Sequence, residues 1–235
     1  MSNTLSSSLC IVACLGFLAY GTACSMNING SVRTSTNEVV DHDLKTVNGS
    51  VRVAEGSVVN GDCKTVNGSV ELGKGAQADN LKTVNGSITL KTEASVEEDV
   101  ETVNGKITAE GNNTVGGNVK TVNGGVKFSD GIDIAGDVEI VNGSVQLAGT
   151  HVGGDVSLRN GKVELESTTV VDGDLVVAGT KKRGKQEDPI EIFLTGQSVI
   201  KGNIIVEDPD REVILHLLEE SRVEGTKEHV TLAEE

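Results

Sequence analysis

Apolar and polar residues recur along this chain with a period of 18 or 19 residues. The dipeptide Asn-Gly marks the period, because it returns at intervals of 19, 19, 18, 19, 19, 19 and 18 residues. A spacing held this closely over seven intervals predicts a repeat architecture whose units stack on one another. The dipeptides that hold this spacing begin at Asn29, Asn48, Asn67, Asn85, Asn104, Asn123, Asn142 and Asn160.

Each repeat contains short segments in which apolar residues lie two positions apart. An apolar residue follows each Asn by three positions, as Val51 and Ile88 do, and in most repeats another follows two positions later, as Val53 does. Such alternation predicts a strand with one buried face. Five residues before the Asn of most repeats, Asp or Asn precedes a further apolar residue, which predicts a second strand in the same register.

Strands this short bury a continuous core only when successive coils pair in parallel. We therefore predict an all-β fold, a single-stranded parallel β-helix (solenoid) of about ten coils of 18 or 19 residues each. The chain lacks the strict six-residue apolar spacing of the left-handed form, which favours the right-handed one. With 29 Gly, no Trp, 1 Tyr and 3 Phe, the core is expected to be thin and filled by small β-branched side chains.

Three segments depart from the repeat. Residues 1–23 join an uncharged start to an apolar run too short to span a bilayer, which predicts a signal peptide. The solenoid is then expected over residues 24–225. Within it, the charged segment 179–189 is predicted to be a loop insertion, and residues 226–235 are predicted to be an acidic C-terminal tail.

The residues at the end of the apolar run resemble the lipobox of bacterial lipoproteins. Thr22 and Ala23 precede Cys24, and in that family the cysteine is lipidated and becomes the mature N-terminus. The resemblance implies lipidation of Cys24 and attachment to a membrane, while the alternative is ordinary cleavage after Ala23. Either route predicts an exported protein in the periplasm, at the outer membrane or on the cell surface.

Asn-Gly is a turn signal, and we attribute it here to the tolerance of both residues for a positive φ. In stacked coils the Asn side chains can hydrogen-bond along the axis as an amide ladder. We predict that these residues have a structural role. The predicted turn ladder consists of Asn48, Asn67, Asn85, Asn104, Asn123 and Asn142.

The residue before each Asn defines a possible contact surface. It is Val in six repeats, while the residue before it is Thr in five and apolar in the next two. If the Thr column faces inward, the Val column is an exposed apolar stripe, which marks a contact site on a soluble protein. If the chain bends at Val, the stripe is buried instead. The stripe consists of Val47, Val66, Val84, Val103, Val122 and Val141.

Few residues suggest chemistry. The column of stacked Asp and Asn residues offers oxygen ligands at a turn, which makes Asp137, Asp155 and Asp174 candidates for weak calcium sites. The alternative is a solvated Gly-Asp corner. The four His share no column, and Cys63 stands in a column of Leu and Val, where a buried thiol is expected. We predict no catalytic residues and no other cofactor.

The formal net charge of −15 excludes one class of partner. A polyanion is repelled by phosphate backbones, so we expect no nucleic-acid binding.

Short coils with a recurring Gly-x-Val-x-Gly-Asp-like pattern are similar to the bactofilins, bacterial polymer-forming proteins. Matching residues are Gly56, Val58, Gly61 and Asp62, then Val152, Gly154, Asp155 and Val156, and later Val199, Gly202, Asn203 and Ile204. The resemblance covers most of residues 26–225. It implies right-handed β-helices that polymerise end to end without nucleotide. Because bactofilins are largely cytosolic, the export signal sets this chain apart from them.

These observations predict a non-enzymatic exported structural or scaffolding protein of the bacterial cell envelope. It is expected to associate with itself or with other envelope components, through its coil ends or through the Val stripe. The alternative is a carbohydrate- or calcium-binding surface protein of the adhesin type. A polysaccharide-degrading enzyme on a β-helix is the least favoured reading, since nothing selects a carboxylate pair.

Overall fold

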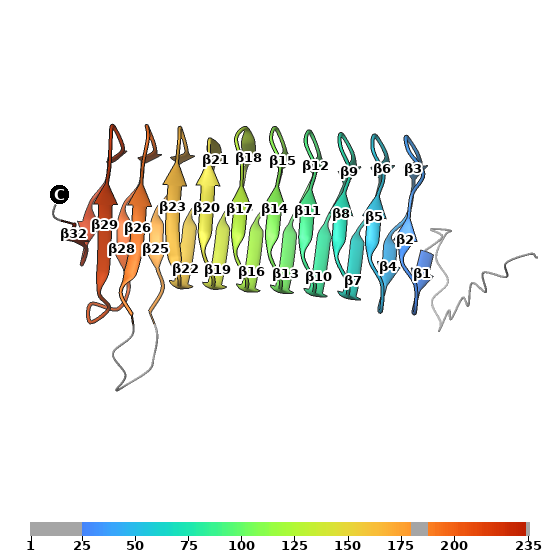
Figure 1. The fold of residues 1–235 in the computed structure, drawn as a ribbon, viewed down its shortest axis with the longest axis horizontal. Helices are drawn as coiled ribbons and strands as arrows, with labels where there is room; N and C mark the ends of the chain where they lie inside the picture. The colour runs from blue at the N-terminus through green and yellow to red at the C-terminus, as the bar shows by residue number, and fades with distance from the viewer. Residues whose placement is uncertain (1–24, 180–187, 234–235) are drawn as a thin grey trace, which may run out of the picture.

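The computed structural model describes residues 25–179 and 188–233. In this part of the chain all regular structure is β, and the strands form three parallel sheets of 11, 11 and 10 strands. Each complete coil gives one strand to each sheet, and the coils stack into a straight rod (Figure 1). The predicted β-solenoid of about ten coils is confirmed.

The three sheets follow one another within each coil. Sheet A contains β1 (Ser25–Asn27), β4 (Leu44–Thr46), β7 (Cys63–Asn67), β10 (Leu81–Asn85), β13 (Val100–Asn104), β16 (Val119–Asn123), β19 (Val138–Asn142), β22 (Val156–Asn160), β25 (Leu175–Val177), β28 (Ile204–Val206) and β31 (Lys227–Glu228). Sheet B contains β2 (Val32–Arg33), β5 (Val51–Val53), β8 (Val70–Leu72), β11 (Ile88–Leu90), β14 (Ile107–Ala109), β17 (Val126–Phe128), β20 (Val145–Ala148), β23 (Lys162–Glu166), β26 (Ile190–Leu194), β29 (Val213–Leu217) and β32 (Thr231–Leu232). Sheet C contains β3 (Val39–Val40), β6 (Val58–Val59), β9 (Gln77–Ala78), β12 (Ser95–Val96), β15 (Thr114–Val115), β18 (Ile132–Ile134), β21 (Thr150–Val152), β24 (Val170–Val171), β27 (Val199–Ile200) and β30 (Arg222–Val223).

Register is conserved from coil to coil, so like residues stack. In sheet A, Leu81 pairs with Cys63 on one side and with Val100 on the other. These residues are fully buried in the core that runs along the axis between the three sheets. The short strands therefore obtain their stability from apolar contacts with neighbouring coils rather than from their own length.

The corner between sheets A and B holds the Asn ladder, which comprises all eight Asn of the Asn-Gly repeats. Each side-chain Nδ2 donates to the Oδ1 of the Asn in the preceding coil, at distances of 2.8 to 3.0 Å. The predicted amide ladder is therefore present from Asn29 to Asn160.

The expected reason for the Asn-Gly dipeptide was wrong. None of the eight ladder Asn residues has a positive φ, and among the glycines that follow them only Gly143 and Gly161 do. The glycines are needed because the corners approach one another closely. A Cβ at Gly86 or Gly105 would overlap the carbonyl oxygen of the corner glycine in the preceding coil.

Left-handed residues occur instead at the corner between sheets B and C. Asn37, Gly56, Gly75, Glu93 and Asn112 follow the ladder Asn by eight positions, and all have a positive φ, of 56° to 67°. This column contains Gly, Asn and Glu, so its composition conceals a shared backbone conformation. The sequence alone did not reveal it.

The corner between sheets C and A carries the Asp/Asn column. The Oδ1 atom of each of these residues typically accepts the backbone N–H of its counterpart in the next coil. For example, Asp99 Oδ1 accepts from the Asn118 N–H at 2.9 Å, and Asn118 Oδ1 accepts from the Asp137 N–H at 2.9 Å. A short side chain with an acceptor oxygen is therefore required in every coil, and either Asp or Asn supplies it.

The solenoid extends beyond the predicted boundary. Strands β31 and β32 lie within residues 226–235, so this segment adds a last coil instead of an acidic tail alone. The predicted insertion 179–189 joins β25 to β26, where other coils have the Asn-Gly corner, and its residues 180–187 lie outside the described residues.

We expect the substitution Gly105→Ala to destabilise the fold by about 1–3 kcal/mol, the range for overpacking, because its Cβ would overlap Gly86 O. The matched control is Gly75→Asn. Gly75 has open space around its Cβ position and a φ of 63°, close to the 56° that Asn37 and Asn112 adopt at this corner. Urea unfolding of both variants would measure the difference, and equal midpoints would contradict the close-approach explanation.

Candidate functional site

The outer face of sheet A carries residues in rows parallel to the rod axis. In β10 the side chains of Leu81 and Thr83 are buried, Lys82 is half-buried on the outer face, and Val84 and Asn85 are exposed. The other five-residue strands from β7 to β16 have the same pattern. Repetition of this strand along the rod thus produces three parallel rows on the face: a row of charged residues, a row of Val and a row of Asn.

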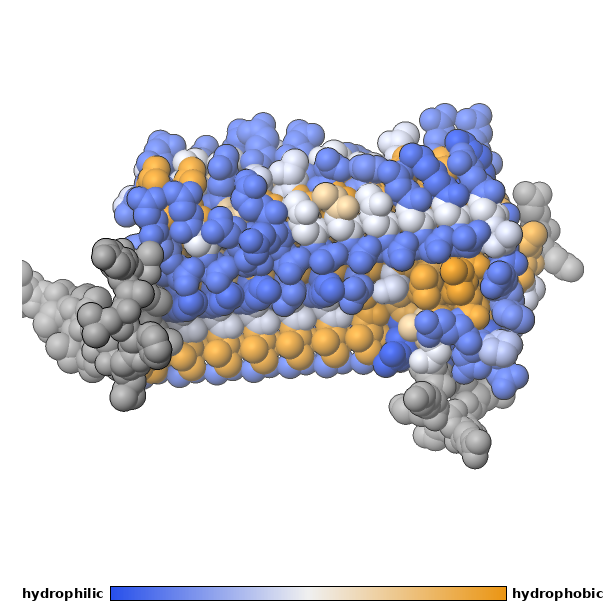
Figure 2. All heavy atoms as spheres, turned by 180° about the vertical axis from the view of Figure 1, so that it is seen from behind, coloured by the Kyte–Doolittle hydropathy of each residue, from blue (hydrophilic) through white to orange (hydrophobic). Residues whose placement is uncertain are grey.

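The Val stripe, defined as Val47, Val66, Val84, Val103, Val122 and Val141, lies on the outside of the rod. Its four central members, from Val66 to Val122, are 38–40% exposed, while the two terminal members are half-buried. Figure 2 shows an unbroken apolar band along one edge of this face. A continuous apolar row on the surface of a protein with a net charge of −15 is an unusual feature, typical of a contact site.

The Thr column explains why Val is turned outward. Thr83 and Thr102 are 4% exposed, and their hydroxyls donate to the carbonyls of the corner glycines Gly68 and Gly86 at 2.8 and 2.9 Å. The buried hydroxyl therefore has a partner and also ties each strand to the corner of the preceding coil. With Thr held inward, the following residue faces solvent. The other donors are Thr46, Thr65 and Thr121.

The Lys/Glu row, defined as Lys45, Lys64, Lys82, Glu101, Lys120 and Glu139, runs beside the stripe. Lys82 Nζ lies 3.4 Å from Glu101 Oε2, and Lys120 Nζ lies 2.9 Å from Glu139 Oε1. The hydrogen bond to Glu139 raises the pKa of Lys120. Exposed pairs of this kind contribute little to stability, but they fix the order of charges on the face. The prediction from sequence did not include this row, although it stands three residues before each ladder Asn.

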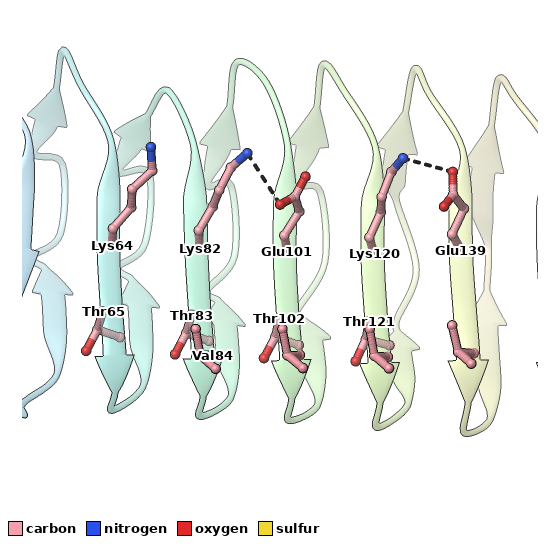
Figure 3. A pocket seen from close by; sticks show the side chains of 13 residues that line it. Lys64, Thr65, Lys82, Thr83, Val84, Glu101, Thr102, Lys120, Thr121 and Glu139 are labelled. Atoms are coloured by element: carbon pink, nitrogen blue, oxygen red, sulfur yellow. Dashed lines mark ion pairs between the residues drawn. The ribbon is translucent and has the colours of Figure 1, made fainter. Parts of the chain in front are cut away.

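A shallow groove of about 530 Å³ lies between the Lys/Glu row and the Val stripe. Figure 3 shows the long side chains of Lys64, Lys82, Glu101, Lys120 and Glu139 on one side of it, with the Thr and Val side chains nearer the strand ends. The groove crosses the coils from β7 to β19. It offers an apolar wall and a charged wall in parallel.

The face changes character towards the C-terminal end of the rod. Arg159 takes the place of Val in the stripe and is exposed. In the row of charged residues, the following outward positions are Ser157, Val176 and Ile205, which are half-buried. Towards this end, apolar residues therefore occupy the row that carries Lys and Glu in earlier coils, and Figure 2 shows an apolar area at this end of the rod.

The candidate calcium residues are engaged with the backbone. The Oδ1 atoms of Asp137, Asp155 and Asp174 accept the N–H groups of Asp155, Asp174 and Asn203 at 2.8, 2.7 and 2.6 Å. Among residues 25–179 and 188–233, no group of three or more His, Cys, Asp or Glu side chains is arranged to hold a metal ion. The geometry gives these carboxylates a structural role at the corner.

Of the two cysteines singled out by the sequence, only Cys63 lies within the described residues. Cys63 is fully buried in the core, and desolvation raises the pKa of its thiol to about 12, as expected for a thiol that packs like an aliphatic residue. Cys24, the proposed lipidation site, lies outside the described residues together with the proposed signal peptide. No helix in the described part of the chain is long and apolar enough to cross a bilayer.

A charged cluster on sheet C was not predicted. His151 lies between the carboxylates of adjacent coils, with Nδ1 at 2.7 Å from Asp133 Oδ1 and Nε2 at 3.1 Å from Asp172 Oδ2. Lys201 Nζ also lies 2.7 Å from Asp172 Oδ1. The hydrogen bonds to Asp133 and Asp172 raise the pKa of His151. Alignment of the coils on sheet C, rather than on Asn-Gly alone, would have placed Asp133 beside His151.

No known protein family, curated protein sequence or solved structure matches this chain. The interpretation of its surface therefore depends on geometry.

The His151 cluster predicts a pH-dependent contribution to stability. Because the folded pKa of His151 is raised above 6.5, its stabilisation is present below that pH and is lost as the pH rises through the folded pKa. His151→Gln should therefore lower the melting temperature at about pH 5.5 and have a smaller effect at about pH 8.5.

The control is Lys91→Gln on another face. The hydrogen bond to Glu110 raises the pKa of Lys91, so this side chain is charged at both pH values and its replacement should have the same effect at each. An equal loss for His151→Gln at both pH values would contradict the titration.

Proposed function

We propose that this chain is a non-enzymatic structural or scaffolding protein of a bacterial cell envelope, and that it self-associates side by side through the outer face of sheet A. The observation that carries the proposal is the exposed Val stripe on a flat, regular face. Burial of apolar surface is the main driving force of most protein association. A flat face is also accessible along its whole length to another flat face.

The coil ends are less suitable for association. Lys227 pairs with Ile204 in register and so takes the position of a buried residue in the last strand of sheet A, where it is exposed. At the other end, Asn27 pairs with the buried Thr46 and is exposed. Polar residues at inward positions of edge strands prevent further strands from adding. Both ends of sheet A therefore favour lateral over end-to-end contact.

The charge distribution supports the same face. The net charge of −15 opposes association of the protein with itself in general. The Lys/Glu row, however, contains four Lys and two Glu, so it carries charges of both signs and does not add to the negative charge of the protein. The stripe and this row lie side by side, which places apolar area beside charges of both signs.

The proposed location rests on the sequence of residues 1–24. A signal peptide would export the protein, and a lipid at Cys24 would confine many copies to one membrane surface. Confinement raises the effective concentration of each copy for its neighbours. A weak lateral contact would then be sufficient to build an assembly.

We expect Val103→Asp to weaken self-association by about tenfold or more, which corresponds to 1.4 kcal/mol, because it places a charge in the centre of the apolar stripe. Val39→Asp is the matched control, since Val39 is 63% exposed but lies on sheet C. Sedimentation velocity over a range of concentrations would measure both variants against the unaltered protein. A protein that remains monomeric at every concentration would refute the proposal.

A further inference from the structure

We infer that two copies pair antiparallel through sheet A. The twofold axis lies in the plane of the face, between β13 and β16 and parallel to these strands. This inference rests on the proposed function and adds the orientation and register of the partner, which is a second copy of this chain. In such a pair, rotation reverses the direction of the rod but keeps each row opposite the same row. The Val stripe then meets the Val stripe, and the Lys/Glu row meets the Lys/Glu row.

The order of charges supports this orientation. Four consecutive outward residues of sheet A alternate as Lys82, Glu101, Lys120 and Glu139. An alternating row with an even number of members is complementary to its own reverse. About the stated axis, Lys82 faces Glu139 of the second copy and Glu101 faces Lys120, and symmetry produces each contact twice. Lys64 faces Ser157, so no like charges meet in this row.

Neighbouring registers are less favourable. If the second copy slides by one coil in one direction, Lys82 faces Lys120 and Glu101 faces itself. If it slides by one coil in the other direction, Glu101 faces Glu139 and Lys120 faces itself. Like charges in direct contact discriminate strongly against wrong registers. The charge order thus disfavours the positions one coil away, and the stated register sets each of the four alternating residues against an opposite charge.

The same register aligns the apolar row. Val84 and Val103 of one copy meet Val141 and Val122 of the other, so four members of the stripe are opposed to four. Three of these are 38–39% exposed in the single chain. Arg159, which ends the stripe, faces Val66 at its margin. The apolar contact is therefore centred on the twofold axis, where burial is most complete.

The extent of the face suits a stable pair. The stated axis lies near the middle of sheet A and brings ten of its 11 strands, from β1 to β28, opposite one another. Six strands of five residues and four strands of three residues, spaced at ~4.8 Å with ~3.3 Å per residue, define a face of about 670 Å². Specific dimers bury about 800 Å² on each partner. In a parallel pair the twofold axis would run in the plane of the face, parallel to the rod. The Lys/Glu row of one copy would then face the Asn ladder side of the other, so the rows would not be complementary.

The Asp/Asn column lies at one edge of sheet A and brings negative charge close to the second copy. Its carboxylates at Asp43, Asp62 and Asp99 lie 2.5, 2.5 and 3.9 Å from the Nζ atoms of Lys45, Lys64 and Lys82. These lysines belong to the face itself and reduce the negative charge that the edge presents to the second copy. The negative edge therefore opposes pairing only weakly, while the Lys/Glu row and the Val stripe provide the attraction.

Two charge-uniform variants test the pairing. Lys82→Glu with Lys120→Glu makes the four-residue row entirely acidic, and Glu101→Lys with Glu139→Lys makes it entirely basic. Each variant alone should lose self-association by at least about tenfold, and an equimolar mixture should form a one-to-one heterodimer. Sedimentation velocity of each sample provides the measurement, with circular dichroism as a check that every variant is folded.

A cross-link tests the register. A copy with Glu101→Cys mixed with a copy with Lys120→Cys should form the 101-to-120 disulfide, identified by mass spectrometry of the linked peptides, faster than either copy links to itself. Preferential 101-to-101 linkage, or a mixture of the charge variants that stays monomeric, would overturn the antiparallel register. If Val103→Asp still abolished association in that case, the lateral contact would stand without this register. If the unaltered protein never associated, both proposals would fail.

Discussion

Close contact between the corner glycines of successive coils is the constraint on which this structure depends. At the corner between sheets A and B, the backbone of one coil lies so near to the next that no Cβ can be accommodated at Gly86 or Gly105. From Gly30 to Gly161, each coil must then return to the same position after 18 or 19 residues. The Asn ladder and the parallel register of these coils follow from that return, and the later coils, which lack this corner, continue the same three sheets and the same core.

A structure built in this way repeats its surface as faithfully as its core. The Thr hydroxyl that bonds to the corner glycine holds Thr83 inward and leaves Val84 outside in the same coil. Repetition turns this local arrangement into a line along the rod. The apolar stripe is thus a consequence of the corner geometry, while the Lys and Glu beside it are free to vary and can carry specificity.

The fold could be predicted from sequence because a one-dimensional repeat makes each contact visible many times. The Asn-Gly spacing and the apolar columns were sufficient to predict the solenoid and the amide ladder. The role of the corner glycines was not predictable, since close approach between coils depends on coordinates, and a positive φ was the simpler explanation. The left-handed column at Glu93 and Asn112 was hidden by mixed composition, and the Lys/Glu row by its alternation of charge.

The Asn ladder also has a consequence for chemical ageing. Asn-Gly is prone to deamidation, in which the glycine nitrogen attacks the Asn side-chain carbonyl carbon, and Asn is among the thermolabile residues. Here the nitrogen atoms of Gly86 and Gly105 donate to the carbonyls of Asn104 and Asn123 at 3.1 Å, and the amides are held in the ladder. The corner that carries this labile dipeptide, from Asn29 to Asn160, therefore also restrains its deamidation, and this edge of the rod stays uncharged.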